Sequence, residues 1–233
     1  MTFAALGGTG LSVVASLTAQ NSKGVTDTLS VSGPFVAHQI ETLLADMPPA
    51  ASKTGLLCSA EVVEAVASLA DRLGPVVVDP VLGSTGGQDL VSRDVPDALC
   101  RKLLPVAALV TPNLAEAAVL AGFPVEDRES MRAAGRSILE TGVGAVLVKG
   151  GHLRGDPVDL LLTEAGTEEF SDSRLEVPEV RGTGCALSAA IAVGLAGGDM
   201  MRTAVIGARR FVRESLATAA PAGRGAWHLG RAD

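Results

Sequence analysis

A glycine-threonine-glycine-cysteine turn stands directly before a run of small apolar residues, and its residue types suggest chemistry. Its members are Gly182, Thr183, Gly184 and Cys185. The turn could bind phosphate, because the glycines let a ligand approach the backbone and the first N–H groups of a helix lack partners within it. A cysteine in the first helical turn also favours a thiolate. The alternative is a glycine-rich helix start with a buried structural cysteine, and the turn alone does not decide between them.

Polar residues follow two apolar runs earlier in the chain. Asp79 comes after the run 76–78 and before a proline, where its carboxylate could hold Mg²⁺ or simply form an Asp-Pro turn. Asn113 and Glu116 follow the run 107–111 and lie one helical turn apart, so both could face one crevice. The same spacing is typical of a capping box, which is the better interpretation without other evidence.

A lysine ends a further apolar run. Lys149 closes the segment 144–149, and two glycines and His152 follow. A lysine at such a point can meet a nucleotide phosphate as a compact charge, and a solvated lysine before a turn is the alternative. We interpret His152 as a loop histidine that lines a nucleotide site. The glycine-rich residues 83–87 could form a flap over a ligand or a plain loop.

The hydrophobic pattern predicts the elements that must position these residues. Short apolar runs alternate with helical patterns, and continuous apolar strands suit a parallel sheet that is covered on both faces. We therefore predict a doubly wound α/β fold with a mostly parallel sheet and helices on both faces. The predicted strands are residues 12–19, 52–57, 75–79, 107–111, 144–149 and 158–163. The predicted helices are 33–47, 59–73, 94–104, 113–121, 129–141, 184–197 and 200–219, with an edge hairpin near 158–178.

The predicted fold implies where the polar residues meet. In an open α/β sheet, ligands collect beyond the carboxyl ends of the strands. Asp79 and Lys149 each end a predicted strand, Asn113 follows one, and the turn 182–185 follows the predicted edge hairpin. We therefore expect these four junctions to lie on the same crevice.

Length, charge and cysteine content narrow the class of protein. The 233 residues fit one α/β domain that spans 1–233. The net charge of -7 argues against a nucleic-acid binder, so any phosphate should belong to a small ligand. Three widely spaced cysteines indicate neither a disulfide framework nor a metal site, which favours a cytoplasmic location. No apolar run reaches the roughly 18 to 20 residues of a membrane span, and the N-terminus lacks the basic start of a signal peptide.

Five motifs, in this order along the chain, resemble the phosphomethylpyrimidine kinases of thiamine biosynthesis, which belong to the ribokinase-like superfamily. They are AQNSKGV at 19–25, DPV at 79–81, TPNLAE at 111–116, VKGGH at 148–152 and GTGCALS at 182–188. The resemblance extends over nearly the whole chain. It implies phosphorylation of 4-amino-5-hydroxymethyl-2-methylpyrimidine and then of its monophosphate, with ATP and Mg²⁺, by a homodimer.

The resemblance also implies how the substrate is held and activated. Gln20 would hydrogen-bond the aminopyrimidine, and Leu56 and Val81 would line its ring pocket. Cys185 would take the proton from the hydroxymethyl group, as a thiolate favoured by the helix N-terminus. The sugar kinases of the superfamily carry an aspartate at this point, so the cysteine resembles the pyrimidine branch.

The remaining implied roles concern the nucleotide. Asn113 and Glu116 match the Asn-x-x-Glu element of the superfamily that organises Mg²⁺ and phosphate, with Asp79 assisting. Lys149 would contact the nucleotide phosphates, and the turn 182–185 would form the anion hole. This set suits phosphoryl transfer, which depends on positioning and charge neutralisation more than on covalent catalysis.

Two departures from the family pattern keep alternatives open. The chain begins directly at the motif TFAALG (residues 2–7), so we expect the first sheet strand and an aspartate that grips the substrate hydroxyl to be missing. Arg181 stands where the family has histidine, and it could reach a phosphate or the nucleotide. A pyridoxal or pyridoxine kinase and a non-catalytic pyrimidine-binding domain are therefore the alternative functions.

Overall fold

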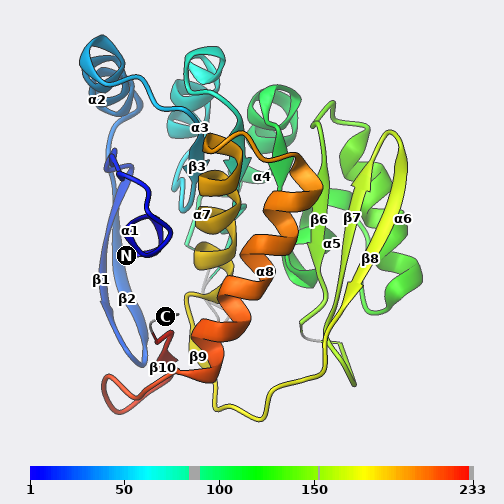
Figure 1. Ribbon diagram of the computed structural model, residues 1–233. Coiled ribbons are helices and arrows are strands. Elements are labelled where there is room, and N and C mark those ends of the chain that lie inside the picture. Colours follow the sequence, from blue (N-terminus) through cyan, green and yellow to red (C-terminus); the bar gives the residue numbers. More distant parts are fainter. Residues whose placement is uncertain (84–89, 152, 231–233) are drawn as a thin grey trace.

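The main sheet contains six strands in the order β3-β4-β5-β6-β7-β8 (Figure 1). A computed structural model of the chain describes residues 1–83, 90–151 and 153–230, so His152 and residues 84–87 of the expected flap lie outside this description. The strands are β3 (Ser52–Thr54), β4 (Val76–Val78), β5 (Leu109–Val110), β6 (Val146–Lys149), β7 (Val158–Thr163) and β8 (Gly166–Ser171). The first four are parallel, and β7 and β8 form the predicted antiparallel hairpin at one edge.

Helices cover both faces of this sheet, as the continuous apolar strands predicted. One face packs against α2 (Gly33–Asp46), α3 (Ala60–Ala67), α4 (Val95–Ala98), α5 (Leu114–Ala121) and α6 (Arg128–Leu139). The other packs against α7 (Thr183–Ala196) and α8 (Met201–Ala217). Within β4, Val76 and Val78 belong to the first core and Val77 to the second. Successive side chains of a strand point to opposite faces, and β4 is therefore buried throughout.

Short helical turns complete the predicted helical segments. The segment predicted at 59–73 contains α3 and a 3₁₀ turn, η1 (Ala70–Arg72). The segment predicted at 94–104 is divided into α4, a turn of π-helix η2 (Leu99–Leu103) and a 3₁₀ turn η3 (Leu104–Val106). Pro105 lies within η3 and lacks the N–H that a continuing helix would need. In the described part of the chain, no helix is long and apolar enough to cross a membrane.

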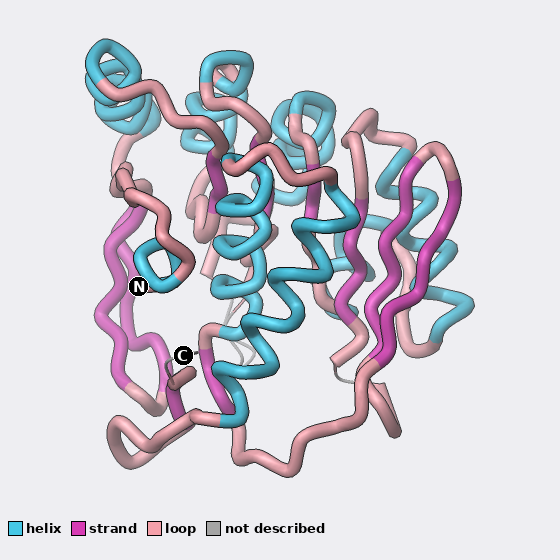
Figure 2. The backbone as a smooth tube through the Cα atoms, in the orientation of Figure 1, coloured by secondary structure: helices cyan, strands magenta, loops and turns pink. Residues whose placement is uncertain are grey.

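The strand predicted at 12–19 is confirmed only for residues 16–19, and it does not belong to the main sheet. A short helix, α1 (Thr2–Ala5), is followed by β1 (Ser16–Asn21), which pairs with β2 (Gly24–Ser30) in a separate antiparallel sheet (Figure 2). The turn between these strands is closed by the side chain of Asn21, whose Oδ1 accepts a hydrogen bond from the N–H of Lys23 at 2.8 Å. The hairpin has little apolar surface to bury, because polar residues fill most of both strands.

A third, small sheet lies below the start of α7. The strands β9 (Val180–Arg181) and β10 (Trp227–His228) pair in parallel. The N–H of Ala226 also donates a 3.0 Å hydrogen bond to the carbonyl of Ser22. The turn of the β1–β2 hairpin, the strand before α7 and the C-terminal segment are therefore in contact, although they are far apart in the sequence.

Candidate active site

Asp79 is the centre of a polar cluster beyond the carboxyl end of β4. It is 2% exposed, so its carboxylate needs polar partners. Lys149 Nζ lies 3.2 Å from its Oδ1. Two hydroxyls donate longer hydrogen bonds of 3.5 Å, from Thr111 to Oδ1 and from Ser188 to Oδ2. The expected meeting of strand ends is therefore present, with the carboxylate at its core.

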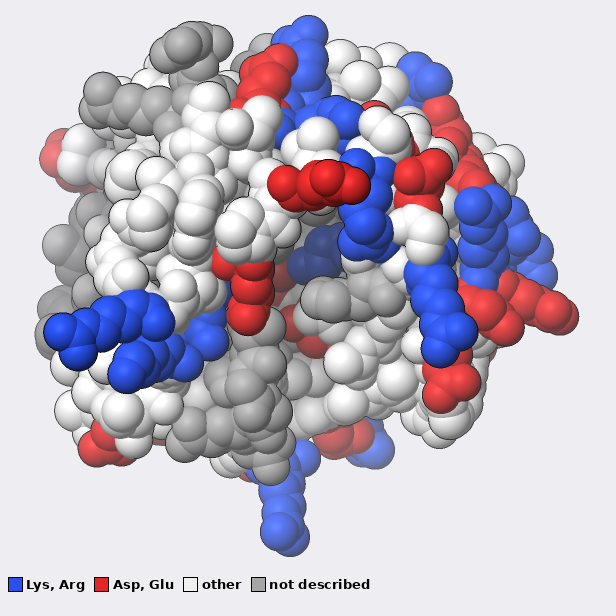
Figure 3. Space-filling model, turned by 90° about the horizontal axis from the view of Figure 1, so that it is seen from below, with Lys and Arg blue, Asp and Glu red and all other residues white. Residues whose placement is uncertain are grey.

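Lys149 connects this carboxylate to the glycine turn. It ends β6, where its N–H donates a 2.8 Å hydrogen bond to the carbonyl of Pro112. A β-carbon on Gly184 would lie 3.0 Å from Lys149 Nζ and 3.9 Å from Asp79 Oδ1. The ammonium therefore lies directly beside the turn, and glycine at 184 keeps the space between them open. Figure 3 shows the molecule from below the view of Figure 1. The surface is hollowed near its centre, and a basic side chain lies deep within the hollow.

The turn itself presents backbone donors. Gly182 is the residue before α7 and has φ of 87°, a left-handed conformation that glycine adopts without strain. No side chain caps this helix end, and the first intrahelical bond runs from the N–H of Ala186 to the carbonyl of Gly182. The N–H groups of Thr183, Gly184 and Cys185 are therefore the ones that an anion at the helix start would meet.

The thiol of Cys185 has a different electrostatic setting from the one expected. One side of the residue is exposed, but the surrounding protein raises the pKa of the thiol above its ordinary value, first by limiting its hydration and then through the charge of Asp79. Lys53 and Lys149 act in the opposite direction and lower this pKa, but they do not outweigh the other causes. The expectation that the helix N-terminus leaves a net lowered thiol pKa is therefore wrong, because limited hydration of the sulfur and the nearby carboxylate of Asp79 both raise the pKa.

Asn113 and Glu116 form the capping box that their spacing allowed. Asn113 Oδ1 accepts a 2.9 Å hydrogen bond from the N–H of Glu116, and Glu116 Oε2 accepts a 2.8 Å bond from the N–H of Asn113. Glu116 is nevertheless 8% exposed and close enough to Lys149 and Asp79 to interact with their charges. Burial is the largest cause that raises the pKa of Glu116 to about 7. The residue therefore caps α5 and also faces the site.

The carboxylates suit a metal ion that is held mainly by phosphate oxygens. In the described residues, no group of three carboxylate, cysteine or histidine side chains forms a complete metal cage. Mg²⁺ usually keeps several waters and binds one or two carboxylates together with substrate phosphates. Asp79 and Glu116, with Lys149 beside the start of α7, fit that requirement.

The residues expected to hold the pyrimidine occupy separate segments. Gln20 lies on β1, where its exposed side chain accepts a 3.5 Å hydrogen bond from Thr18. Leu56, after β3, is half-buried, and its carbonyl accepts a 3.4 Å hydrogen bond from Ser16 at the start of β1. Val81 is half-buried two residues after Asp79. The base of the hairpin is therefore anchored beside Leu56, while Gln20 lies further out along it.

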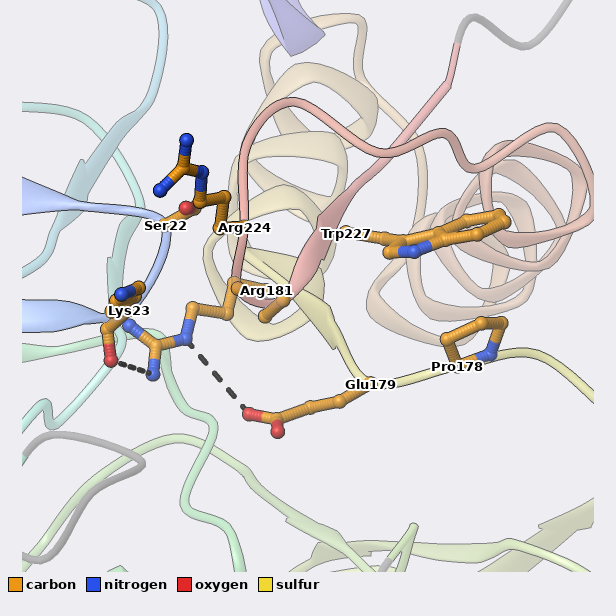
Figure 4. A pocket seen from close by; sticks show the side chains of 9 residues that line it. Ser22, Lys23, Pro178, Glu179, Arg181, Arg224 and Trp227 are labelled. Carbon is orange, nitrogen blue, oxygen red and sulfur yellow. Dashed lines mark hydrogen bonds and ion pairs between the residues drawn. The ribbon is translucent and has the colours of Figure 1, made fainter.

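Arg181 contacts the hairpin turn. Its Nη2 donates a 3.1 Å hydrogen bond to the carbonyl of Lys23, and its Nε lies 3.9 Å from Glu179 Oε1 (Figure 4). The strand β9 that carries it leads directly into Gly182. The residue thus joins the hairpin to the start of the anion-binding turn.

Sequence reasoning missed three residues of this site. Thr111 and Ser188 are buried and donate to Asp79. Lys53 is paired in register with Val77, which faces α7, and its charge acts on Cys185. A lysine inside the predicted strand 52–57 was the available signal, since a cation in a covered strand requires a reason. Ser188 gave a weaker one, because it follows Cys185 at helical spacing.

The overall fold is similar to that of small-molecule kinases of known structure. The phosphomethylpyrimidine kinase of Clostridium difficile is similar with a TM-score of 0.80 and 34% identity, over 91% of this chain and 89% of that one. The pyridoxal kinase of Staphylococcus aureus in complex with AMP-PCP and pyridoxal is similar with a TM-score of 0.90 and 26% identity, over 99% and 85%. The predicted ribokinase-like fold is confirmed.

Sequence comparison narrows the class further. A family model described as phosphomethylpyrimidine kinase matches residues 1–230. The chain is 41% identical to the hydroxymethylpyrimidine/phosphomethylpyrimidine kinase of Rhizobium meliloti, over 94% of this chain and 83% of that protein. It is 43% identical to the thiamine biosynthesis bifunctional protein of Geobacter sulfurreducens, of which it spans 46%. The chain belongs to the phosphomethylpyrimidine kinase family.

Proposed function

We propose that this protein transfers the γ-phosphoryl group of ATP to 4-amino-5-hydroxymethyl-2-methylpyrimidine, and then a second phosphoryl group to the monophosphate. In each step an acceptor oxygen forms a bond to the γ-phosphorus, the bond to the bridging oxygen breaks, and ADP leaves. The observation that carries the proposal is the close approach of Lys149 to both Asp79 and Gly184 of the turn 182–185. Phosphoryl transfer needs mainly such positioning and neutralisation of charge.

The nucleotide roles are divided among three kinds of group. Lys149 binds the nucleotide phosphates as a point charge, and the N–H groups at the start of α7 hold the oxygens of the moving phosphoryl group. Asp79 and Glu116 hold Mg²⁺, and Asn113 keeps Glu116 in place through the capping box. When bound, Mg²⁺ neutralises charge that develops on the phosphate oxygens. His152 is the further residue that we assign to the nucleotide, whereas the hydrogen bond of Arg181 to the carbonyl of Lys23 directs that side chain to the hairpin turn.

The acceptor lies between the hairpin and the turn. Gln20 hydrogen-bonds the aminopyrimidine, and Leu56 and Val81 contact its ring. Cys185 accepts the proton of the hydroxymethyl group, and Lys53 and Lys149 partly offset the causes that raise the pKa of its thiol. The second phosphorylation needs no such base, because its nucleophile is already a phosphate oxygen.

Phosphorus NMR of the purified protein with MgATP and the aminopyrimidine alcohol tests the function directly. We expect ADP together with the monophosphate and later the diphosphate of the pyrimidine. The variant Lys149→Met should lose most of the turnover, whereas Lys102→Met, an exposed lysine on η2, should keep it. ADP formation that does not depend on the pyrimidine, or no phosphorylated pyrimidine at all, would refute the kinase assignment.

Pyridoxal is the second candidate acceptor, since a pyridoxal kinase complex has a TM-score of 0.90 with this chain. Both acceptors are hydroxymethyl heterocycles, and competition between them in one reaction measures the ratio of their kcat/KM values. We expect the aminopyrimidine to be preferred. A preference for pyridoxal would assign the protein to the alternative activity.

We further propose that the chain acts as a single domain in a cytoplasmic homodimer that binds neither nucleic acid nor membranes. Leu17 and Leu29 face each other across the hairpin and are 53% and 64% exposed, and a second copy would cover them. Analytical ultracentrifugation tests this assembly, and the double variant Leu17→Ser/Leu29→Ser should shift it toward the monomer. A parent protein that sediments as a monomer at all concentrations would exclude it.

A further inference from the structure

A cavity of about 470 Å³ lies outside the Asp79 cluster, where three distant segments meet (Figure 4). Its lining comes from the hairpin turn, from the strand before α7 and from the C-terminal segment. This volume lies within the range of small-molecule sites. The residues that line it are Ser22, Lys23, Pro178, Glu179, Arg181, Arg224, Gly225, Ala226 and Trp227.

Two glycines let the C-terminal segment close this cavity. A β-carbon on Gly223 or on Gly225 would collide with Ser22 of the hairpin turn. Because the two glycines have no side chains, the segment lies directly against the turn. The residue between them, Arg224, therefore lies at the cavity. The sequence Gly-Arg-Gly at 223–225 thus allows close packing against the turn, and this packing has no role in the proposed phosphoryl transfer.

The cavity carries positive charge that the described protein leaves largely unpaired. Lys23 and Arg224 form no ion pair with any described residue, although the chain has a net charge of -7. The one acidic lining residue, Glu179, is 63% exposed and lies 3.9 Å from Arg181 Nε, too far for a hydrogen bond. Arg181 Nε is buried and has no hydrogen-bond partner. Such a donor requires an acceptor, and an anion in the cavity would supply it.

The opposite end of the cavity is apolar. The indole of Trp227 and the ring of Pro178 lie together on one side, while Lys23, Arg181 and Arg224 lie on the other (Figure 4). A planar ring can stack on an indole, and arginine binds phosphate through charge-assisted hydrogen bonds. The chemistry of the lining therefore matches a molecule that carries both a ring and a phosphate.

We propose that this cavity is a second binding site, separate from the site of transfer, for a small phosphorylated aromatic molecule. The ring lies against Trp227 and the phosphate lies among Lys23, Arg181 and Arg224. Arg181 contacts the hairpin turn and directly precedes Gly182, so the bound molecule contacts both segments that border the transfer site.

The composition of the chain supplies a local probe for this site. Trp227 is the only tryptophan, and the chain has no tyrosine, so intrinsic fluorescence reports the cavity. The probe ligand is the aminopyrimidine monophosphate, added without ATP so that no transfer takes place. We expect a saturable change of emission with the monophosphate, competition by inorganic pyrophosphate, and no change with the unphosphorylated alcohol.

Matched variants distinguish the cavity from the transfer site. Arg224→Gln should weaken binding of the monophosphate about tenfold, as expected for one lost charge-assisted contact, while Arg210→Gln, an exposed arginine of α8, should bind like the parent. Calorimetry should show that Arg224→Gln weakens one binding event per chain by the same factor, while any binding at the transfer site is unchanged.

Three results would overturn the proposal. They are the absence of a saturable change at millimolar monophosphate, equal affinities of Arg224→Gln and Arg210→Gln, and a signal that is lost in Gln20→Ala but kept in Arg224→Gln. The last result would mean that the indole reports the transfer site. The titration contains no ATP and needs no phosphoryl transfer. Its result can therefore be interpreted even if the kinase assay fails.

Discussion

Replacing Glu116 with glutamine should remove a loss of stability that the titration of Glu116 causes as pH rises. The side chain is 8% exposed, and burial raises its pKa from 4.5 to about 7. Between these pH values the folded state keeps a proton that the unfolded state has released, so the free energy of unfolding of the parent falls as pH rises. The difference between a pKa of 4.5 and one of about 7 corresponds to a loss of about 3 kcal/mol in the free energy of unfolding. The loss is complete above pH 7.

Glutamine has no such titration, yet its Oε1 can still accept the hydrogen bond from the N–H of Asn113. The free energy of unfolding of Glu116→Gln, relative to the parent, should therefore increase by about 3 kcal/mol between about pH 4.5 and about pH 8. Urea unfolding followed by circular dichroism measures both proteins at both pH values. Other titrating groups are shared and cancel in the comparison.

The exposed Glu164→Gln is the matched control and should show no such increase. Added Mg²⁺ should stabilise the parent at about pH 8 more than the Glu116→Gln variant, because only the ionised carboxylate binds the metal. A relative stability of Glu116→Gln that is equal at both pH values would refute the inferred burial of the charge. Equal stabilisation of the two proteins by Mg²⁺ would remove Glu116 from the metal site.

Three further substitutions test the acceptor side of the site. Cys185→Ala should slow phosphorylation of the alcohol about a hundredfold and that of the monophosphate far less, followed as ADP release with each substrate; equal losses would contradict the role as base. Gly184→Ala places a methyl group 3.0 Å from Lys149 Nζ, so kcat should fall while the melting temperature stays close to that of the parent. Gly207→Ala, where a β-carbon meets no atom within 4 Å, is its control, and an unchanged kcat in Gly184→Ala would argue against phosphate binding there. Lys53→Met removes a charge that lowers the pKa of Cys185, so the pH profile of the first step should move to higher pH, and movement to lower pH would contradict this reasoning.

The parts of the site that depend on topology could be predicted from the sequence. Asp79 and Lys149 each follow a buried parallel strand, and parallel strands bring their carboxyl ends to one edge of the sheet. The left-handed conformation of Gly182 likewise follows from local chemistry. These predictions needed only the order of the strands and the types of residue at their ends.

The parts that depend on distant contacts could not be predicted. The pKa of the Cys185 thiol is raised first by burial and then by Asp79, which lies more than a hundred residues earlier in the chain, so the helix N-terminus alone was misleading. Residues 16–19 of the strand predicted at 12–19 lie in β1 and not in the main sheet, because the turn at Asn21 creates a local antiparallel partner. The cavity beside Trp227 requires three segments to meet, and no single motif of the sequence indicates that meeting.

The ion pair between Lys149 and Asp79 balances the two charges before nucleotide and metal bind. A lone buried carboxylate or a lone ammonium would be unstable between turnovers, but each serves as the counterion of the other. When nucleotide and metal bind as proposed, the ammonium can turn to phosphate and the carboxylate to the metal, so the pair exchanges partners. Local charge balance is then preserved before, during and after binding. The protein can therefore keep strong charges in a covered site without losing its fold in the absence of substrate.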